Sequence, residues 1–268
     1  LYLAPGVLRR DHPGLTMMHF THIPWPGPET WHNLPGTWVR VICESLLACD
    51  IVGFQTNSAV EAFAATCLEY VEGVKVARDK EGNTLVSRPT GQGEAGVTWV
   101  RAYPISIDPQ EVMRVYRSPE AADWKAKLQA DLGNYDKLIV RVDRLDPNKN
   151  VVAGFESYQQ LLQDRPDLAG KVVFLALLVP TRESVPEYAQ YKDQTFELID
   201  QINEEFGRKN WRPVHYIYGN DYARALAALS MADVVLVNSV ADGMNLVAKE
   251  GVIVSEKPSV LVLSTNTG

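Results

Sequence analysis

Residues 242–250, Asp-Gly-Met-Asn-Leu-Val-Ala-Lys-Glu, decide how the second half of this chain is expected to fold. They follow an apolar run at 233–238, Asp-Val-Val-Leu-Val-Asn, which is typical of a buried parallel strand. The apolar run at 260–263 predicts the next strand. The stretch between the runs therefore predicts a turn that opens a helix, where free N–H groups and the positive end of the helix dipole suit a phosphate.

Two carboxylates accompany this predicted phosphate seat. Asp242 and Glu250 are expected to lie about two turns apart along the helix, on roughly one face. Carboxylates accept hydrogen bonds from hydroxyl groups such as those of a sugar or a ribose, so the combination suggests a sugar nucleotide. The alternative, an Asp that caps the helix and a solvated Glu, fits the spacing equally well.

Composition narrows the class of protein. The chain has 268 residues, a net charge of −7 and no block of Lys and Arg, which argues against nucleic acid as a partner and against a polybasic membrane arm. No apolar run has the length of a membrane span, and the start shows no secretory signal. Three cysteines without metal-ligand spacing favour reduced thiols and a cytoplasmic location. Because the chain opens at Leu1 rather than Met, we expect a fragment of a longer protein.

Strands and helices alternate along the chain, which predicts an α/β fold with parallel sheets. The length allows two domains. We expect the helix at 58–70 to be capped by Asn57 or Ser58. Between 74 and 100 we expect two strands around residues 80–83, and a glycine-rich surface loop at 91–96.

The loop that follows the predicted strand at 15–20 carries His22. Residues 21–28, Thr-His-Ile-Pro-Trp-Pro-Gly-Pro, contain prolines that prevent further strand pairing and stiffen the loop. Ligands bind at the carboxyl ends of strands in open α/β sheets, so His22 is well placed for a site. A histidine that only satisfies the backbone of its loop is an equal alternative.

Two further loops place cations after predicted strands. Residues 143–150, Asp-Arg-Leu-Asp-Pro-Asn-Lys-Asn, follow a strand expected at 137–142. Arg144 offers a planar fork and Lys149 a mobile point charge, a pair that suits a diphosphate. The alternative is surface pairing with Asp143 and Asp146, which the local sequence slightly favours. Arg182 likewise follows a strand expected at 171–178.

Four segments in this order closely resemble one family, the trehalose-6-phosphate synthases. They are residues 22–29 (His-Ile-Pro-Trp-Pro-Gly-Pro-Glu), 142–150 (Val-Asp-Arg-Leu-Asp-Pro-Asn-Lys-Asn), 179–188 (Val-Pro-Thr-Arg-Glu-Ser-Val-Pro-Glu-Tyr) and 242–250. The family consists of retaining glycosyltransferases with two Rossmann-like domains in the GT-B arrangement. The resemblance implies that residues 1–110 are the C-terminal part of an incomplete acceptor-side domain. It implies that residues 111–268 are a nucleotide-sugar-binding domain, truncated at its end.

The resemblance also implies roles in binding the donor. His22 resembles the histidine that contacts the donor glucose near its 6-hydroxyl. Arg144 and Lys149 resemble the pair that holds the donor diphosphate. Asp242 resembles the carboxylate on the 3-hydroxyl of the donor sugar, and Glu250 the acceptor of the ribose hydroxyls.

The remaining implied roles concern the backbone and the acceptor. A cradle for the donor's sugar and phosphate is implied for Gly243, Met244, Asn245, Leu246 and Val247. Arg182 resembles the arginine that contacts the 6-phosphate of the acceptor. No cofactor and no metal are implied, because Arg144 and Lys149 take the place of a divalent ion.

The implied reaction is the transfer of glucose from UDP-, GDP- or ADP-glucose to glucose 6-phosphate, with retention, to give trehalose 6-phosphate. Two alternatives stay open: a pseudo-glycosyltransferase that joins cyclitol units, and a non-catalytic regulatory subunit. The oligomeric state is open as well, a homo-oligomer included. Three departures from the family pattern leave the base preference open. Ala241 stands where Arg is frequent, residues 147–150 replace a common Tyr-Ser-Lys-Gly, and the stretch from 221 to 233 is shorter.

Overall fold

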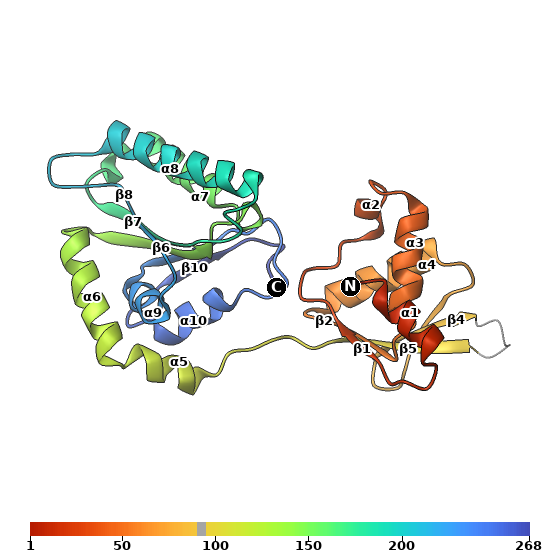
Figure 1. Ribbon diagram of the computed structural model, residues 1–268. Helices are drawn as coiled ribbons and strands as arrows, with labels where there is room; N and C mark the ends of the chain where they lie inside the picture. The colour runs from red at the N-terminus through yellow and green to blue at the C-terminus, as the bar shows by residue number, and fades with distance from the viewer. Residues whose placement is uncertain (90–94) are drawn as a thin grey trace. The chain divides into compact units, whose positions relative to one another are not determined.

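The computed structural model describes residues 1–89 and 95–268, and the chain folds as two compact units. The first unit comprises Leu1–Ile105 together with Gly268, and the second comprises Ser106–Thr267 (Figure 1). Each unit has a five-stranded sheet of its own. The boundary expected at 110 falls inside the first helix of the second unit, α5 (Pro109–Tyr116).

The sheet of the first unit is mixed, with the strand order β1-β2-β5-β4-β3. Three strands run parallel, and they are β1 (Met18–Phe20), β2 (Ile51–Phe54) and β5 (Ala95–Ala102). The other two strands are antiparallel, β4 (Thr84–Pro89) to β5 and β3 (Lys75–Arg78) to β4. The region from 74 to 102 thus holds three strands rather than two. The surface loop expected at 91–96 lies mostly outside the described residues, and Gly96 belongs to β5.

A tight turn explains why β3 and β4 are antiparallel. The backbone N–H of Asp79 donates to the carbonyl of Asn83 at 3.0 Å, which closes the turn. The Asp79 carboxylate accepts from the N–H groups of Glu81 and Asn83, at 2.9 and 2.8 Å. A connection this short can join only antiparallel strands, since parallel strands need a long crossover.

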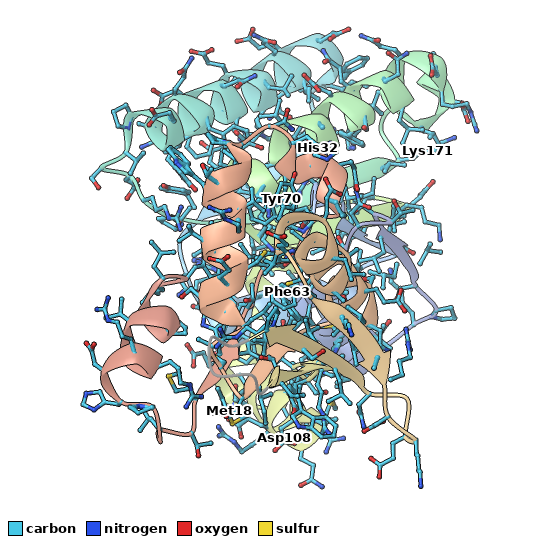
Figure 2. The ribbon with its side chains drawn as sticks, turned by 90° about the vertical axis from the view of Figure 1, so that its right-hand side faces the viewer. Met18, His32, Phe63, Tyr70, Asp108 and Lys171 are labelled. Carbon is cyan, nitrogen blue, oxygen red and sulfur yellow. The ribbon has the colours of Figure 1, made fainter. Side chains whose placement is uncertain are left out.

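Aromatic side chains anchor the loop after β1 to the core of the first unit. The helices of this unit are α1 (Ala4–Asp11), α2 (Pro28–Trp31), α3 (Gly36–Leu46) and α4 (Asn57–Tyr70). Trp25 is buried, with its ring centroid 5.0 Å from that of Phe63, and its indole N–H donates to Thr66 at 3.1 Å. Figure 2 shows Phe63 inside the unit, whereas Met18, which is 67% exposed, lies on the edge strand β1. The proline-rich loop that carries His22 is therefore held in place by Trp25, which is buried in the core of this unit.

The sheet of the second unit is entirely parallel, with the strand order β10-β9-β6-β7-β8. Its strands are β6 (Lys137–Arg144), β7 (Val172–Val179), β8 (Val214–Tyr218), β9 (Val234–Val237) and β10 (Val260–Leu263). The chain places β7 and β8 on one side of β6, then returns to place β9 and β10 on the other. The order of the strands thus reverses between β6 and β9, and the carboxyl ends of these two strands flank the usual ligand crevice of such sheets.

Helices cover both faces of this second sheet (Figure 1). One face carries α7 (Val151–Asp164) and α8 (Pro186–Phe206), and the other carries α5, α6 (Pro119–Leu132), α9 (Tyr222–Met231) and α10 (Leu246–Val254). Two short 3-10 helices, η1 (Pro147–Lys149) and η2 (Pro166–Leu168), flank α7. Buried apolar side chains from both layers meet on the central strands, and β7 is buried along almost its whole length. Within the described ranges, no helix is long and apolar enough to cross a membrane.

The N-cap of α4 differs from the prediction. Thr56, rather than Asn57 or Ser58, is the capping residue, and its hydroxyl accepts from the N–H of Ala59 at 3.3 Å. Thr56 has extended backbone angles, which a cap requires, whereas Asn57 already belongs to the helix.

This assignment predicts the effect of two alanine substitutions on stability. Thr56→Ala should lower the free energy of unfolding by about 1 kcal/mol, because the N–H of Ala59 loses its acceptor. Asn57→Ala is the matched control and should change it by less than about 0.5 kcal/mol. Urea denaturation followed by tryptophan fluorescence measures both. A larger loss for Asn57→Ala would show that the cap is misassigned.

Candidate functional site

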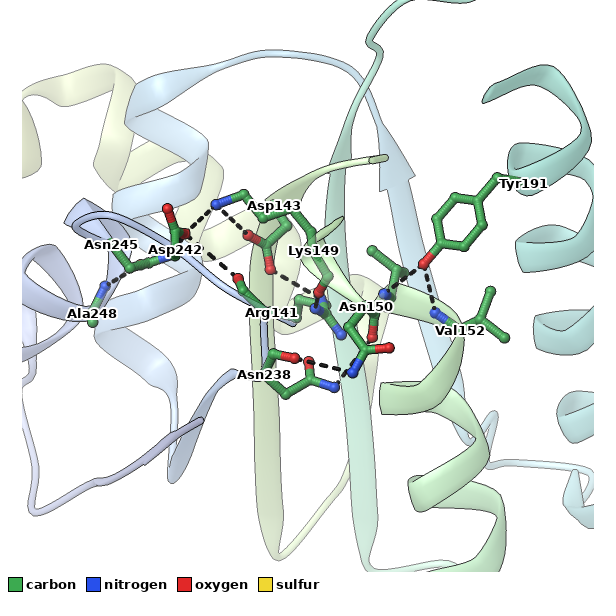
Figure 3. Close-up of polar contacts among 12 residues, drawn as sticks. Arg141, Asp143, Lys149, Asn150, Val152, Tyr191, Asn238, Asp242, Asn245 and Ala248 are labelled. Atoms are coloured by element: carbon green, nitrogen blue, oxygen red, sulfur yellow. Dashed lines mark hydrogen bonds and ion pairs between the residues drawn. The ribbon is translucent and has the colours of Figure 1, made fainter. Parts of the chain in front are cut away.

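Two charged residues lie inside the central strand β6 of the second unit. The side chain of Arg141 is 0% exposed and that of Asp143 is 2% exposed. Residues two apart in a strand point to the same face, and the Arg141 Nε donates to the Asp143 Oδ2 at 3.0 Å (Figure 3). Taking either charge out of water alone would be costly, so each depends on the other for its burial.

Lys149 connects this buried pair to the loop after β9. Its Nζ lies 4.0 Å from the Asp143 Oδ1 and forms a closer ion pair with the Asp242 Oδ2 (Figure 3). The side chains of Lys149 and Asp242 are 13% and 18% exposed. The Arg141 Nη2 also donates to the carbonyl oxygen of Lys149. Lys149 is therefore held through both its ammonium group and its backbone.

Amide side chains bind the loops after β6 and β9 into one structure. The Asn150 Nδ2 donates to the carbonyl of Asn238 at 3.2 Å, and the Asn238 Nδ2 donates to the carbonyl of Asn150 at 3.1 Å. The backbone carbonyl of Asn148 accepts a hydrogen bond from the loop after β9, and its side-chain amide donates one to the same loop. Asn150 has a φ of 56°, a left-handed conformation that favours glycine. The reciprocal amide bonds help to hold Asn there.

The two helices that begin at this edge of the sheet differ at their N-termini. At α7, the hydroxyl oxygen of Tyr191 accepts from the N–H groups of Val151 and Val152, at 2.8 and 3.2 Å. At α10, none of the described residues accepts a hydrogen bond from the N–H of Leu246 or Val247. The N-terminus of α10 is thus the one suited to an anion.

The structure corrects the predicted placement of Asp242. Helix α10 begins only at Leu246, so Asp242 and Glu250 do not share a face of one helix. Asp242 is not the cap either, because Asn245 is the capping residue and accepts from the N–H of Ala248 at 3.0 Å. The Asn245 Nδ2 donates to the Asp242 Oδ2 at 3.1 Å. Asp242 therefore lies at the mouth of the turn, between Lys149 and the helix end.

Glu250 lies further along α10, where it contacts α9. Its Oε1 accepts a hydrogen bond from the Tyr222 hydroxyl at 3.0 Å. Burial raises the pKa of Glu250, and the Tyr222 hydrogen bond opposes that rise. Burial, together with the nearby Glu250, raises the pKa of Tyr222 to about 12. Glu250 is therefore a half-buried acceptor with a partner rather than a solvated surface carboxylate.

The other predicted cations occupy the same edge of the second sheet. Arg144 is the last residue of β6, is exposed, and has no side-chain partner within the described chain. Surface pairing with Asp143 or Asp146, the alternative, is therefore not found for Arg144. Arg182 follows β7 with a φ of 45°, and its Nη1 donates to the Tyr188 hydroxyl at 2.8 Å.

His22 belongs to the first unit. It is exposed on the loop after β1, and its ring lies 4.8 Å from that of Phe20 between centroids. The structure therefore gathers the predicted residues of the second unit at one sheet edge, and it gives His22 only a local setting.

Burial and charge act against each other on Asp143. Burial raises the pKa of Asp143 to about 6, although Arg141 and Lys149 both pull it down. Burial likewise lowers the pKa of Arg141, and Asp143 and Tyr191 oppose that change. The cluster thus brings two basic side chains, Arg141 and Lys149, together with two acidic ones, Asp143 and Asp242.

Sequence reasoning did not identify Arg141, Tyr191 or Asn238. A signal for Arg141 was present, since Arg141 and Asp143 alternate within an otherwise apolar run that predicts a buried strand. No local signal marks Tyr191 or Asn238, because their partners are distant in the sequence. Over the described ranges, no group of three or more His, Cys, Asp and Glu side chains is arranged to hold a metal ion.

Comparison with known proteins gives a match along the whole chain. Residues 1–268 match glycosyltransferase family 20. A probable alpha,alpha-trehalose-phosphate synthase (UDP-forming) from Arabidopsis thaliana is 34% identical over 272 residues, which cover all of this chain and 31% of the plant protein.

Solved structures show the same fold. The crystal structure of an alpha,alpha-trehalose-phosphate synthase from Burkholderia xenovorans, in complex with glucose-6-phosphate, matches with a TM-score of 0.89 and 30% identity. An E. coli structure bound with UDP-2-fluoro glucose matches with a TM-score of 0.85 and 30% identity. All of this chain is covered in both, against 58% and 57% of the two solved chains.

The chain thus spans about a third of the plant relative and somewhat more than half of the two solved chains. Its α/β fold, with one all-parallel and one mostly parallel sheet, agrees with theirs. The match over every residue and the shared fold show that this chain belongs to glycosyltransferase family 20, among the homologues of the trehalose-6-phosphate synthases.

Proposed function

We propose that the full-length protein transfers glucose, with retention, from a nucleoside-diphosphate glucose to glucose 6-phosphate and forms trehalose 6-phosphate. One observation carries the proposal: Lys149 and Asp242 meet where the strand order reverses, beside the N-terminus of α10. The ligands of the related structures, glucose-6-phosphate in one and UDP-2-fluoro glucose in the other, support the choice of substrates.

The donor diphosphate is proposed to bind at this edge of the second unit. Arg144 offers an exposed guanidinium without a protein partner among the described residues, and Lys149 offers an ammonium held by its backbone. The N–H groups from Gly243 to Val247 complete the cradle at the helix end. Negative charge grows on the departing diphosphate as the glycosidic carbon becomes cationic, and these groups stabilise that charge.

Binding of the donor requires Lys149 and Asp242 to exchange partners. In the structure each side chain satisfies the other. The donor diphosphate would attract the Lys149 ammonium, and the 3-hydroxyl of the sugar would donate to the Asp242 carboxylate in its place. Because both side chains are already charged and in place, the exchange needs little rearrangement of the loops.

The ribose is proposed to bind at Glu250. Its half-buried carboxylate has two oxygens, and the Tyr222 hydroxyl donates to Oε1. A carboxylate accepts several hydrogen bonds, so ribose hydroxyls can donate to the remaining positions. The base then falls near the start of α9, in the stretch from 221 to 233 that is shorter than the family pattern.

The proposed reaction breaks the bond from the donor's anomeric carbon to the diphosphate. A bond to the anomeric oxygen of glucose 6-phosphate forms on the same face, and the proton of that hydroxyl passes to the departing diphosphate. Double displacement of the glycosidase kind needs a carboxylate pair astride the anomeric carbon, which the proposed donor site does not include. We expect Arg144 and Lys149 to supply the charge that a divalent ion supplies elsewhere.

The acceptor and the far side of the donor sugar are assigned to two other residues. We propose that Arg182 binds the 6-phosphate of the acceptor, since its guanidinium is exposed and held at the Tyr188 hydroxyl. We propose that His22 contacts the donor glucose near its 6-hydroxyl. Each assignment depends on the carboxyl end of a strand in the residue's own unit and on the family motif.

A product assay tests the proposed function. The full-length protein, incubated with glucose 6-phosphate and with UDP-, GDP- or ADP-glucose in turn, should form trehalose 6-phosphate from at least one donor. Product detected by mass spectrometry, with nucleoside diphosphate released in equal amount, would agree with transfer. Failure with all three donors would reject the synthase assignment in favour of a regulatory role or of cyclitol substrates.

Arg144 gives the cleanest test of diphosphate binding, because its removal breaks no contact within the described chain. Arg144→Ala should lower turnover about 10²–10³-fold, as expected when one charge-stabilising group is lost. Lys149→Ala should lower it as well, but it also leaves Asp143 and Asp242 without their cation. Arg117→Ala, which removes another exposed arginine of the second unit, is the control and should retain wild-type turnover. Wild-type turnover in Arg144→Ala would rule out the assignment.

Arg182 tests the acceptor assignment. Arg182→Ala should raise the KM for glucose 6-phosphate about ten- to a hundredfold, the value of a charge-assisted contact to phosphate, and should leave nucleotide binding nearly unchanged. Arg182→Lys should recover only part of the loss, because the planar fork is absent. Unphosphorylated glucose as acceptor is the internal control and should respond little. Weaker nucleotide binding with an unchanged KM for glucose 6-phosphate would move Arg182 to the donor site.

A further inference from the structure

The Arg141 guanidinium lies at the centre of the charged cluster without reaching the surface. Its side chain is 0% exposed, so it has no access to a diphosphate. Its Nε donates to Asp143, and its Nη2 donates to the carbonyl oxygen of Lys149 (Figure 3). Arg141 thus contacts Lys149 directly through its carbonyl and indirectly through Asp143, and Lys149 is the cation that we propose binds the donor.

The fold accommodates this guanidinium at a cost in stability. A Cβ at Gly154 would lie 2.4 Å from the Arg141 Nη1, so a larger residue at that position would require the guanidinium to move. Glycine in a helix interior is destabilising relative to alanine. The Nη1 is also buried without a hydrogen-bond partner among the described atoms. An apolar side chain in place of a buried ion pair is often neutral or stabilising, so packing alone does not explain an arginine here.

We propose that Arg141 is a positioning residue that holds Lys149 for the donor diphosphate and balances the charge of the cluster. The inference rests on the proposed function, because it concerns the same donor site. Arg141 acts through two partners: it fixes the Lys149 backbone directly, and it keeps the Asp143 carboxylate charged beside the Lys149 ammonium.

The charges that face Asp143 come from three segments. Arg141 lies on the same strand, Lys149 on the loop after it, and Asp242 on the loop after β9. Tyr191 of α8 also faces Arg141. With both carboxylates ionised, the two cations and two anions sum to zero. Loss of the Arg141 charge would leave the cluster with one net negative charge, which repels a diphosphate and favours protonation of Asp143.

Binding of a nucleoside diphosphate by the full-length protein tests the charge balance without requiring transfer. R141M keeps an unbranched, flexible side chain and removes the charge. Measured above the raised pKa of Asp143, so that this carboxylate is ionised, its Kd for UDP, GDP or ADP, whichever the wild type binds most tightly, should rise about tenfold or more, as is typical when a group supporting a ligand-binding side chain is lost. R141M/D143N removes one cation and one carboxylate together, which restores neutrality. Its Kd should return most of the way to the wild-type value.

The pH dependence of kcat/KM for the donor gives a second readout. Asp143 is charged above its pKa of about 6, so wild-type activity should fall as the pH drops through that value and Lys149 loses a partner. In R141M the carboxylate lacks its closest cation, so the acid limb should move up by about 1–3 pH units. R141K retains the charge, so the acid side of its pH profile of kcat/KM should stay near that of the wild type. The double variant should lack this limb, because Asn does not titrate.

These measurements separate positioning from packing and the inference from the proposed function. A packing role predicts that R141M/D143N binds no better than R141M and that the acid limb stays in place, and either result would overturn the inference. A wild type that binds nucleoside diphosphate and transfers glucose, with R141M indistinguishable from it, would overturn the inference alone. A wild type that does neither would overturn both. If R141M does not fold, R141K and R141M/D143N provide the test. A shifted acid limb in R141K, or weak binding of nucleoside diphosphate by the double variant, would count against Arg141 as a positioning residue.

Discussion

The ion pair between Lys149 and Asp242 is the interaction on which the candidate site depends. It joins the loops that leave β6 and β9, two neighbouring strands that lie far apart in the sequence. A surface ion pair contributes little to stability, but this one is mostly buried and continues into Asp143 and Arg141. The network fixes the geometry of both loops at the point where the strand order reverses, between β6 and β9. The other features of the site are arranged around it.

Many element boundaries were predictable because proline and glycine mark them locally. Helices α6 and α8 begin at Pro119 and Pro186, which preset the first helical φ, and α6 ends before Gly133 with its φ of 67°. The two strands expected around residues 80–83 are β3 and β4, which a short turn at Asp79 makes antiparallel, whereas β5 was not predicted as a third strand of this region. The cap at Thr56 was missed by a single position, which is the usual uncertainty at a helix end.

The candidate site was predictable in its residue types and less so in its geometry. Loops at the carboxyl ends of parallel strands must share one sheet edge, which brings Arg144, Lys149 and Asp242 onto it. The start of α10 was placed too early, because Asn245 rather than Asp242 bonds the first turn. Arg141 was missed although it alternates with Asp143 within an apolar run, because its contact to the Lys149 backbone has no pattern in the sequence.

The Tyr191 hydroxyl, which takes up the first N–H groups of α7, has a consequence for how a ligand can lie. In many dinucleotide-binding folds the first helix after the first strand receives the phosphate. With two equivalent anion sites side by side, a diphosphate could bind in two positions, and in one of them the sugar would be displaced from the reacting position. Because the Tyr191 hydroxyl occupies the N–H groups at the start of α7, that second position is not offered. Under the proposed function, the N-terminus of α10 is the remaining anion site, and it would give the donor a single direction along the crevice.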